Sequence, residues 1–74
     1  MDKDRIRQTL AYYEQFRSEL LGDLGGYESG VHYTGEIRGG ERIDTTAKTI
    51  ADLKGRIART ENVIAAYRAD LDSL

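Results

Sequence analysis

The side chains able to do chemistry are few and scattered along this 74-residue chain. Cysteine is absent, and the single histidine, His32, has no second histidine or cysteine to join it in a metal site. We therefore interpret His32 as a polar strand position. Gly39-Gly40 is a turn signal, since its neighbours do not resemble a phosphate-binding loop. The carboxylates are dispersed, so we expect no catalytic residue, no metal, no cofactor and no enzymatic activity.

Composition limits the classes of function. The net charge of −2 argues against general nucleic-acid binding as the main task. A chain this short has a core that is only just sufficient, and without disulfides oligomerisation is the remaining common support. No apolar run is long enough to span a bilayer, and the charged N-terminus is not typical of a signal peptide. We expect a soluble intracellular protein with no membrane partner.

The strongest pattern lies in the C-terminal third of the chain. Apolar residues recur there in alternating steps of three and four, which predicts a long helix over about 47–73, packed along its length against another helix. Thr49 and Asp52 match a capping box at its start, and Thr46 is the alternative cap. The predicted core positions of this helix are Ile50, Leu53, Ile57, Ile64, Tyr67 and Leu71.

The other side of the same helix carries a second, uniformly small pattern. We call it the small-residue face: Ala51, Gly55, Ala58, Asn62, Ala65 and Ala69. Either these residues let a neighbouring subunit's helix approach closely, or alanine is present as the best helix former on an exposed surface. Gly55 favours the first interpretation, because glycine costs about 1 kcal/mol relative to alanine in a helix interior. We therefore expect a subunit interface.

The N-terminal part predicts a shorter helix over about 4–21, capped by Asp2 or Asp4 and followed by a glycine-rich loop over 22–30. Tyr12 and Tyr13 are adjacent, so they cannot both face one core. We assign Tyr13 to the core and Tyr12 to the surface, either as an interface anchor or as an ordinary surface aromatic. The predicted core positions of this helix are Ile6, Leu10, Tyr13, Phe16 and Leu20.

A β-hairpin is predicted over about 31–45, where apolar and polar residues alternate on either side of the glycine turn. We favour a three-residue turn, Gly39–Glu41, because it sets Ile37 opposite Ile43 on a buried face. A two-residue turn would set Ile37 opposite Arg42 instead.

These elements predict one small domain over residues 1–74 in the order α-β-β-α. The expected fold class is α+β and predominantly helical, with two antiparallel helices and the hairpin packed across one end of the pair. We expect the second helix to overhang the first.

Residues 42–57 resemble the gpW family of tailed-phage head–tail joining proteins. The shared pattern is an arginine, an aliphatic and an acidic residue, then Thr-Ala, a Ser/Thr cap, an aliphatic residue, Asp-Leu-Lys, and an isoleucine four residues after the leucine. Gly40 also lies at the family's distance before Asp52. The chain departs from the family in a longer loop before the hairpin and in an acidic helical end, 70–74, where the family tends to finish in a flexible basic tail.

The resemblance implies a structural protein of the virion neck, present in the host cytoplasm before assembly. Copies would form a ring under the portal protein, close the DNA-filled head and present a docking surface to the next neck or tail protein. In isolation we expect a monomer or a weak oligomer. The role of the family's basic tail does not transfer to this chain.

Basic residues gather around the hairpin and the first half of the second helix. Within the resemblance they face channel DNA or acidic patches on a partner; otherwise they form a solvated surface with local pairs, such as Asp52 with Arg56. The protruding hairpin is a natural docking device. The predicted docking or DNA-facing residues are Arg38, Gly39, Gly40, Arg42, Lys48, Arg56 and Arg59.

A competing function is a small phage- or plasmid-encoded regulatory module that inhibits a host enzyme, acting as a helical-hairpin monomer or dimer. Its acidity would suit DNA mimicry, but the charges are interspersed rather than clustered.

Overall fold

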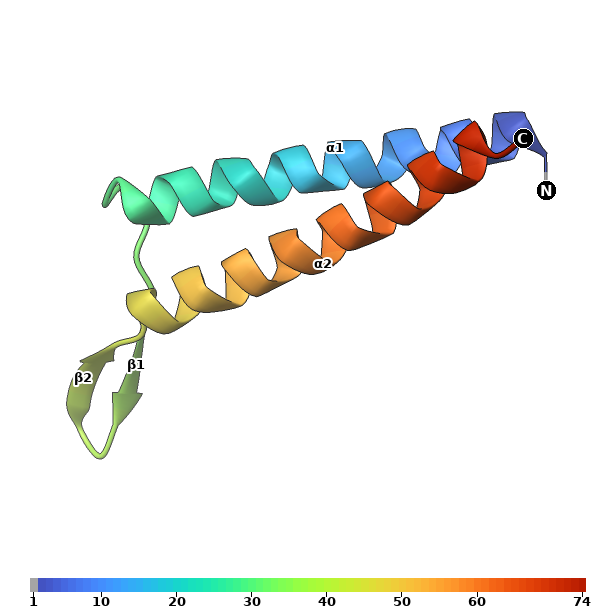
Figure 1. Ribbon diagram of the computed structural model, residues 1–74. Helices are drawn as coiled ribbons and strands as arrows, with labels where there is room; N and C mark the ends of the chain where they lie inside the picture. The colour runs from blue at the N-terminus through green and yellow to red at the C-terminus, as the bar shows by residue number, and fades with distance from the viewer. Residues whose placement is uncertain (1) are drawn as a thin grey trace.

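The computed structural model describes residues 2–74 and contains two long helices separated by a two-stranded hairpin (Figure 1). The elements are α1 (Lys3–Glu28), β1 (Gly35–Arg38), β2 (Glu41–Asp44) and α2 (Thr46–Asp72). The expected α-β-β-α order and mostly helical class are confirmed. The helices run antiparallel, so the first turns of α1 and the last turns of α2 lie at the same end (Figure 1).

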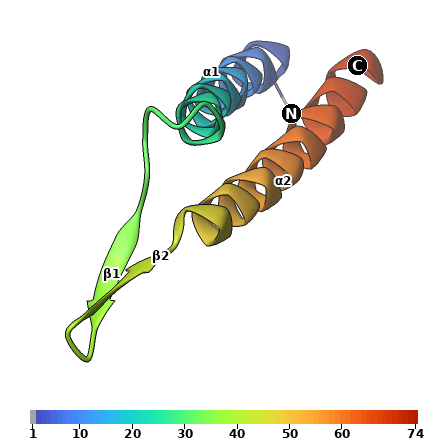
Figure 2. The same cartoon turned by 90° about the vertical axis from the view of Figure 1, so that its left-hand side faces the viewer.

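The molecule is elongated, with extents of 57 × 21 × 14 Å. Its radius of gyration is 16.9 Å, whereas a compact domain of this length has a value of about 11 Å. Figure 2 shows the hairpin extending away from both helices at the end opposite the termini. The hairpin therefore does not pack across the end of the helix pair, contrary to the sequence-based expectation.

The core is a single seam between the two helices. Ile6 and Leu20 are buried from α1, and Leu53, Ile57 and Ile64 from α2. The three α2 residues lie four and seven positions apart, which keeps them on one side of the helix. The remaining predicted core residues of the two helices are half-buried: Leu10, Tyr13, Phe16, Ile50, Tyr67 and Leu71.

A polar residue completes the seam without a penalty. Thr60 is buried between Ile57 and Ile64, and its hydroxyl donates a 2.8 Å hydrogen bond to the carbonyl oxygen of Arg56. The hydroxyl is thereby satisfied within its own helix, so it needs no partner on α1. Further along, the rings of Tyr13 and Tyr67 stack with centroids 5.9 Å apart and join the first half of α1 to the last third of α2.

The first helix is longer than predicted. It continues to Glu28, so the expected end near Leu21 and the loop over 22–30 are both wrong. The reason is packing: Leu24 and Tyr27 extend the apolar side of α1 and pack against the cluster around Leu20. The free energy gained by that burial offsets the cost of glycine in a helix, which is about 1 kcal/mol at each of Gly22, Gly25 and Gly26.

One of those helical glycines, Gly26, lies close to the side chain of His32. A Cβ added at Gly26 would lie 2.2 Å from an atom of the His32 ring. The chain reverses after α1 at Gly30, whose φ of 83° is a left-handed conformation that glycine adopts without strain.

The second helix matches its predicted bounds within one residue, but its start and its overhang differ. The N-cap is Thr45 rather than Thr49 or the alternative Thr46, so the capping box does not form. The helices contain 26 and 27 residues, so α2 does not overhang α1 by the expected length.

Two exposed ion pairs bridge the two helices, Arg68–Glu14 at 2.8 Å and Lys54–Glu28 at 3.9 Å. Such pairs are worth about 0–1 kcal/mol each.

The hairpin register also differs from the prediction. Ile37 pairs with Arg42 across a two-residue turn, and Ile43 pairs with Glu36. Both turn glycines have positive φ, 58° at Gly39 and 83° at Gly40, which is the backbone of a type I′ turn. Ile37 is therefore 77% exposed, while Ile43 is half-buried on the other face. With no element covering the hairpin, turn geometry rather than burial sets the register.

Replacing a buried leucine of the seam by alanine should cost more stability than replacing an exposed one. Leu53→Ala removes a side chain that is 8% exposed, and we expect a loss of about 2–5 kcal/mol in the free energy of unfolding. A loss of that size is a large fraction of the total stability of a domain this small. Urea denaturation followed by circular dichroism measures the change.

Leu21→Ala is the matched control, because Leu21 is 47% exposed on α1. Its effect should stay within about 1 kcal/mol. Equal losses in the two variants would contradict a seam centred on Leu53.

Candidate docking site on the hairpin

The base of the hairpin is tied to α2 by hydrogen bonds among four threonines, which we call the threonine clasp: Thr34, Thr45, Thr46 and Thr49. The Thr45 hydroxyl donates to the Thr34 hydroxyl at 3.0 Å, and the Thr34 and Thr49 hydroxyls lie 2.8 Å apart. The Thr34 amide donates to the Thr46 hydroxyl at 3.1 Å. The Thr45 amide donates to the Thr34 carbonyl oxygen at 3.0 Å.

These contacts are polar and partly buried, and each typically contributes about 0.5–1.5 kcal/mol. The clasp joins the residue before β1 to the first turn of α2. It therefore sets the direction in which the hairpin leaves the helix.

Asp44 completes the junction at the end of β2. Its carboxylate accepts hydrogen bonds from the Thr46 hydroxyl at 2.6 Å and from the Thr46 amide at 2.9 Å. These two donors hold the pKa of Asp44 below its usual value, the side-chain hydrogen bond contributing more. The negative charge also lies at the positive end of the α2 dipole. Asp44 thus satisfies the helix start, the task that the sequence had suggested for Thr49.

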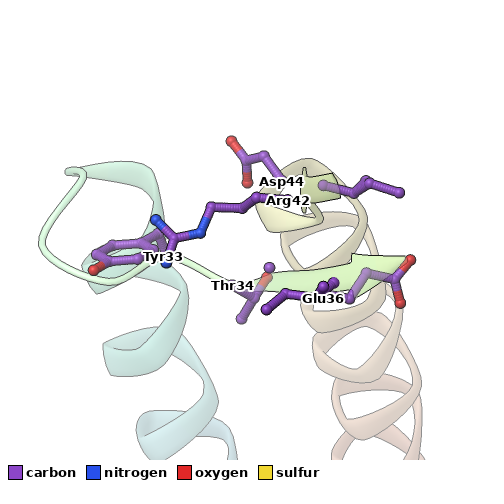
Figure 3. Close-up of a pocket in the computed structure, with 8 residues that line it drawn as sticks. Tyr33, Thr34, Glu36, Arg42 and Asp44 are labelled. Atoms are coloured by element: carbon purple, nitrogen blue, oxygen red, sulfur yellow. The ribbon is translucent and has the colours of Figure 1, made fainter. Parts of the chain in front are cut away.

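A shallow recess of about 510 Å³ lies along the hairpin. This volume falls within the range of about 300–1,000 Å³ typical of binding sites. Tyr33 is 82% exposed beside it, and Gly35, which has no side chain, lies between Tyr33 and Ile37. Figure 3 shows the Arg42 side chain directed toward the Tyr33 ring and Glu36 directed away from both. The full lining is Tyr33, Thr34, Gly35, Glu36, Ile37, Arg42, Ile43 and Asp44.

The two hairpin arginines, predicted to act together, lie on opposite faces. Arg42 pairs with Ile37 and Arg38 with Glu41, so successive pairs point to alternate sides of the ladder. Arg38 forms an ion pair with Glu36. Among residues 2–74 the Arg42 guanidinium has no ion-pair partner.

The other predicted basic residues, Lys48, Arg56 and Arg59, are exposed on α2. No ion pair joins Asp52 and Arg56 in the described part of the chain. Both residues instead line a second recess of about 310 Å³ with Asp23, Tyr27, Thr49 and Leu53.

The small-residue face lies away from α1. All of its residues are exposed except Gly55, which is half-buried. A Cβ at Gly55 would lie 3.3 Å from an Arg59 guanidinium nitrogen, and that flexible group can move aside. Packing within the chain therefore does not explain this glycine, and the interface assignment remains a prediction.

The two adjacent tyrosines differ in burial, as the sequence predicted. Tyr12 is 64% exposed, while Tyr13 is half-buried against Tyr67. His32 precedes β1 and is therefore not the expected strand residue; its ring contacts Tyr27 with centroids 5.7 Å apart.

Sequence reasoning missed the clasp and the role of Tyr33 beside the recess. The available signals were four threonines close to the hairpin and a tyrosine in phase with Ile37. No cluster of side chains suited to a metal ion is found within residues 2–74. Neither described helix is both long and apolar enough to cross a membrane.

The junction should respond to acid. Because the pKa of Asp44 is lowered in the folded chain, its stabilising contribution is present above the unfolded pKa and is lost as pH falls through the folded value, below about pH 4. We expect the Thr46 amide resonance to shift as its acceptor is protonated, which an NMR pH titration measures.

Asp44→Asn should abolish this titration, whereas Glu41→Gln, on the same strand, should leave it unchanged. A Thr46 amide that titrates normally in Asp44→Asn would contradict the assignment.

No protein-family model, no curated protein and no solved structure matches this chain.

Proposed function

We propose that this chain is a structural adaptor of the head–tail joining type, which assembles as a ring under a phage portal and presents its hairpin to the next neck or tail protein. The observation that carries the proposal is the hairpin itself. It projects from the helix pair, and Tyr33 and Ile37, two of the most exposed large apolar residues, lie on it or beside it.

The shape of the subunit supports a role in assembly. A two-helix seam buries few large side chains, so the isolated chain has a small margin of stability. Several apolar residues remain exposed outside the seam, which is typical of surfaces that become covered by partners. They are Tyr12, Leu21, Val31, Tyr33, Ile37 and Leu74.

The resemblance to the gpW family supports the same function. It spans 42–57, and these residues include β2 after its first position, the Asp44 junction and the first half of α2. This segment fixes the hairpin to the helix, so the shared residues coincide with the part that positions the docking surface.

In the proposed ring, the small-residue face contacts the adjacent subunit. It lies opposite the seam, so a neighbouring helix can approach it without disturbing the contact between α1 and α2. Small side chains permit closer approach than the usual 8–10 Å between helix axes. Tyr12 contributes a second contact from α1, and the exposed cations Lys48, Arg56 and Arg59 face channel DNA or acidic portal residues. The ring would lie in the virion neck.

A charge on the small-residue face should block assembly but not folding. Ala58→Glu places a carboxylate on an exposed helical position, so the circular dichroism spectrum should be unchanged. Burying that unpaired charge between subunits should lower ring occupancy on purified portal complexes of the parent phage by at least about tenfold. Native mass spectrometry counts the bound copies.

Ala11→Glu is the matched control, since Ala11 is equally a small exposed residue but lies on α1. It should assemble as the unmodified chain does. Full ring occupancy by Ala58→Glu would show that the small-residue face is only a solvent face, and no binding of the unmodified chain to portal complexes would contradict the adaptor function.

A further inference from the structure

Exposed apolar side chains are concentrated in one short segment around the start of the hairpin. The exposed fraction of the side chain is 72% for Val31, 82% for Tyr33 and 77% for Ile37. By contrast, leucine and isoleucine side chains of the helices are buried in the seam. A two-stranded hairpin is marginally stable alone in water. This segment is held by the threonine clasp rather than by an apolar core, so its exposed side chains do not serve the fold of the isolated chain.

One side of this segment has the form of a binding surface, which we call the open face: Tyr33, Gly35, Ile37 and Arg42. Gly35 and Ile37 point to the same side of the ladder, and Arg42 is paired with Ile37. All four residues line the recess, with Arg42 directed toward Tyr33 (Figure 3). The open face thus combines two apolar side chains with one cation.

Arg42 is the one charged side chain among the four residues of the open face, and Asp44, which pairs with Gly35, lies next to it on the same side of the ladder. Glu36 is engaged by Arg38 and is directed away from Arg42, and the Asp44 carboxylate accepts two hydrogen bonds from Thr46. Arg42 has no such partner within residues 2–74. A guanidinium beside apolar surface favours a carboxylate, which it can bind through two parallel hydrogen bonds.

The anion that suits Arg42 is better a protein carboxylate than a nucleic-acid phosphate. Binding to a phosphate backbone requires several cations on one surface, whereas the open face carries one and the whole chain has a net charge of −2. The apolar side chains on either side of Gly35 also suit alternating apolar residues of a peptide.

The backbone supplies the remaining element of recognition. The sheet has two strands, so β1 has β2 on one side and no strand on the other. An extended segment can pair with such an edge and place alternate side chains on the open face.

We propose that the open face binds an extended, acidic segment of the partner protein, with an aspartate or glutamate at Arg42 and apolar side chains beside Tyr33 and Ile37. This inference rests on the proposed adaptor function and names the chemistry of the protein that docks on the ring.

The test is a selection from a display library of random, blocked seven-residue peptides with the full chain as bait. We expect enrichment of peptides with an acidic residue two positions from an apolar one. Peptides selected by the unmodified chain should bind Arg42→Glu at least about tenfold more weakly, because attraction becomes repulsion. Arg38→Glu, on the opposite face, should bind them as the unmodified chain does.

Amide chemical-shift changes locate the bound peptide, and they should be largest along β1. Ile37→Ser should weaken binding without altering the circular dichroism spectrum, since Ile37 lies outside the seam. Enrichment of basic peptides, no enrichment, or unchanged affinity in Arg42→Glu would overturn the proposal.

Binding of either of two other partners to the open face would also overturn the proposal. Sedimentation velocity would reveal a second copy as self-association that is lost in Ile37→Ser, and a duplex DNA titration would reveal nucleic acid as binding that is lost in Arg42→Glu. Failure of the peptide selection with normal ring assembly would leave the adaptor function standing, while failure of assembly with normal peptide selection would remove that function alone.

Discussion

The contact between the apolar sides of α1 and α2 is the constraint on which the rest of the molecule depends. It buries Leu20 of one helix against Leu53 and Ile57 of the other, and Phe16, Leu24 and Tyr27 pack around them. Two helices share one surface, so burial occurs on one side of each. The outward sides of the helices and the whole hairpin are thereby left uncommitted to the fold.

This division explains why the candidate surfaces can be described separately. The small-residue face lies behind the seam on α2, whereas the open face lies beyond the end of the helix pair. Neither contributes a residue to the buried set. Substitutions on either surface can therefore change association while the contact that holds the subunit together remains.

The long helix and its buried stripe were predictable because a repeat of three and four residues directly encodes one side of a helix. The end of α1 was not predictable in the same way. The glycines after Leu21 indicated a helix end, whereas the apolar spacing continues through Leu24 and Tyr27. The hairpin register failed for a related reason. It assumed that Ile37 must be buried, whereas the two glycines of the turn decided the pairing.

The threonine clasp illustrates a limit of a different kind. Its hydrogen bonds join Thr34 to threonines 11 to 15 residues later in the chain. Such contacts have no period and depend on how the chain turns at Asp44, so neither composition nor spacing reveals them. Tyr33 directly precedes Thr34 of the clasp, so the recess beside it was likewise absent from the sequence-based site.

The threonine clasp also makes the hairpin a lever that is anchored at one end only. Each strand of the arm has four residues, so at about 3.4 Å per residue the glycine tip lies on the order of 14 Å beyond it. A swing of about 10° would then carry the tip through about 2–3 Å, a distance obtained from that strand rise. The position of the tip is therefore set by small differences in geometry at the threonine clasp.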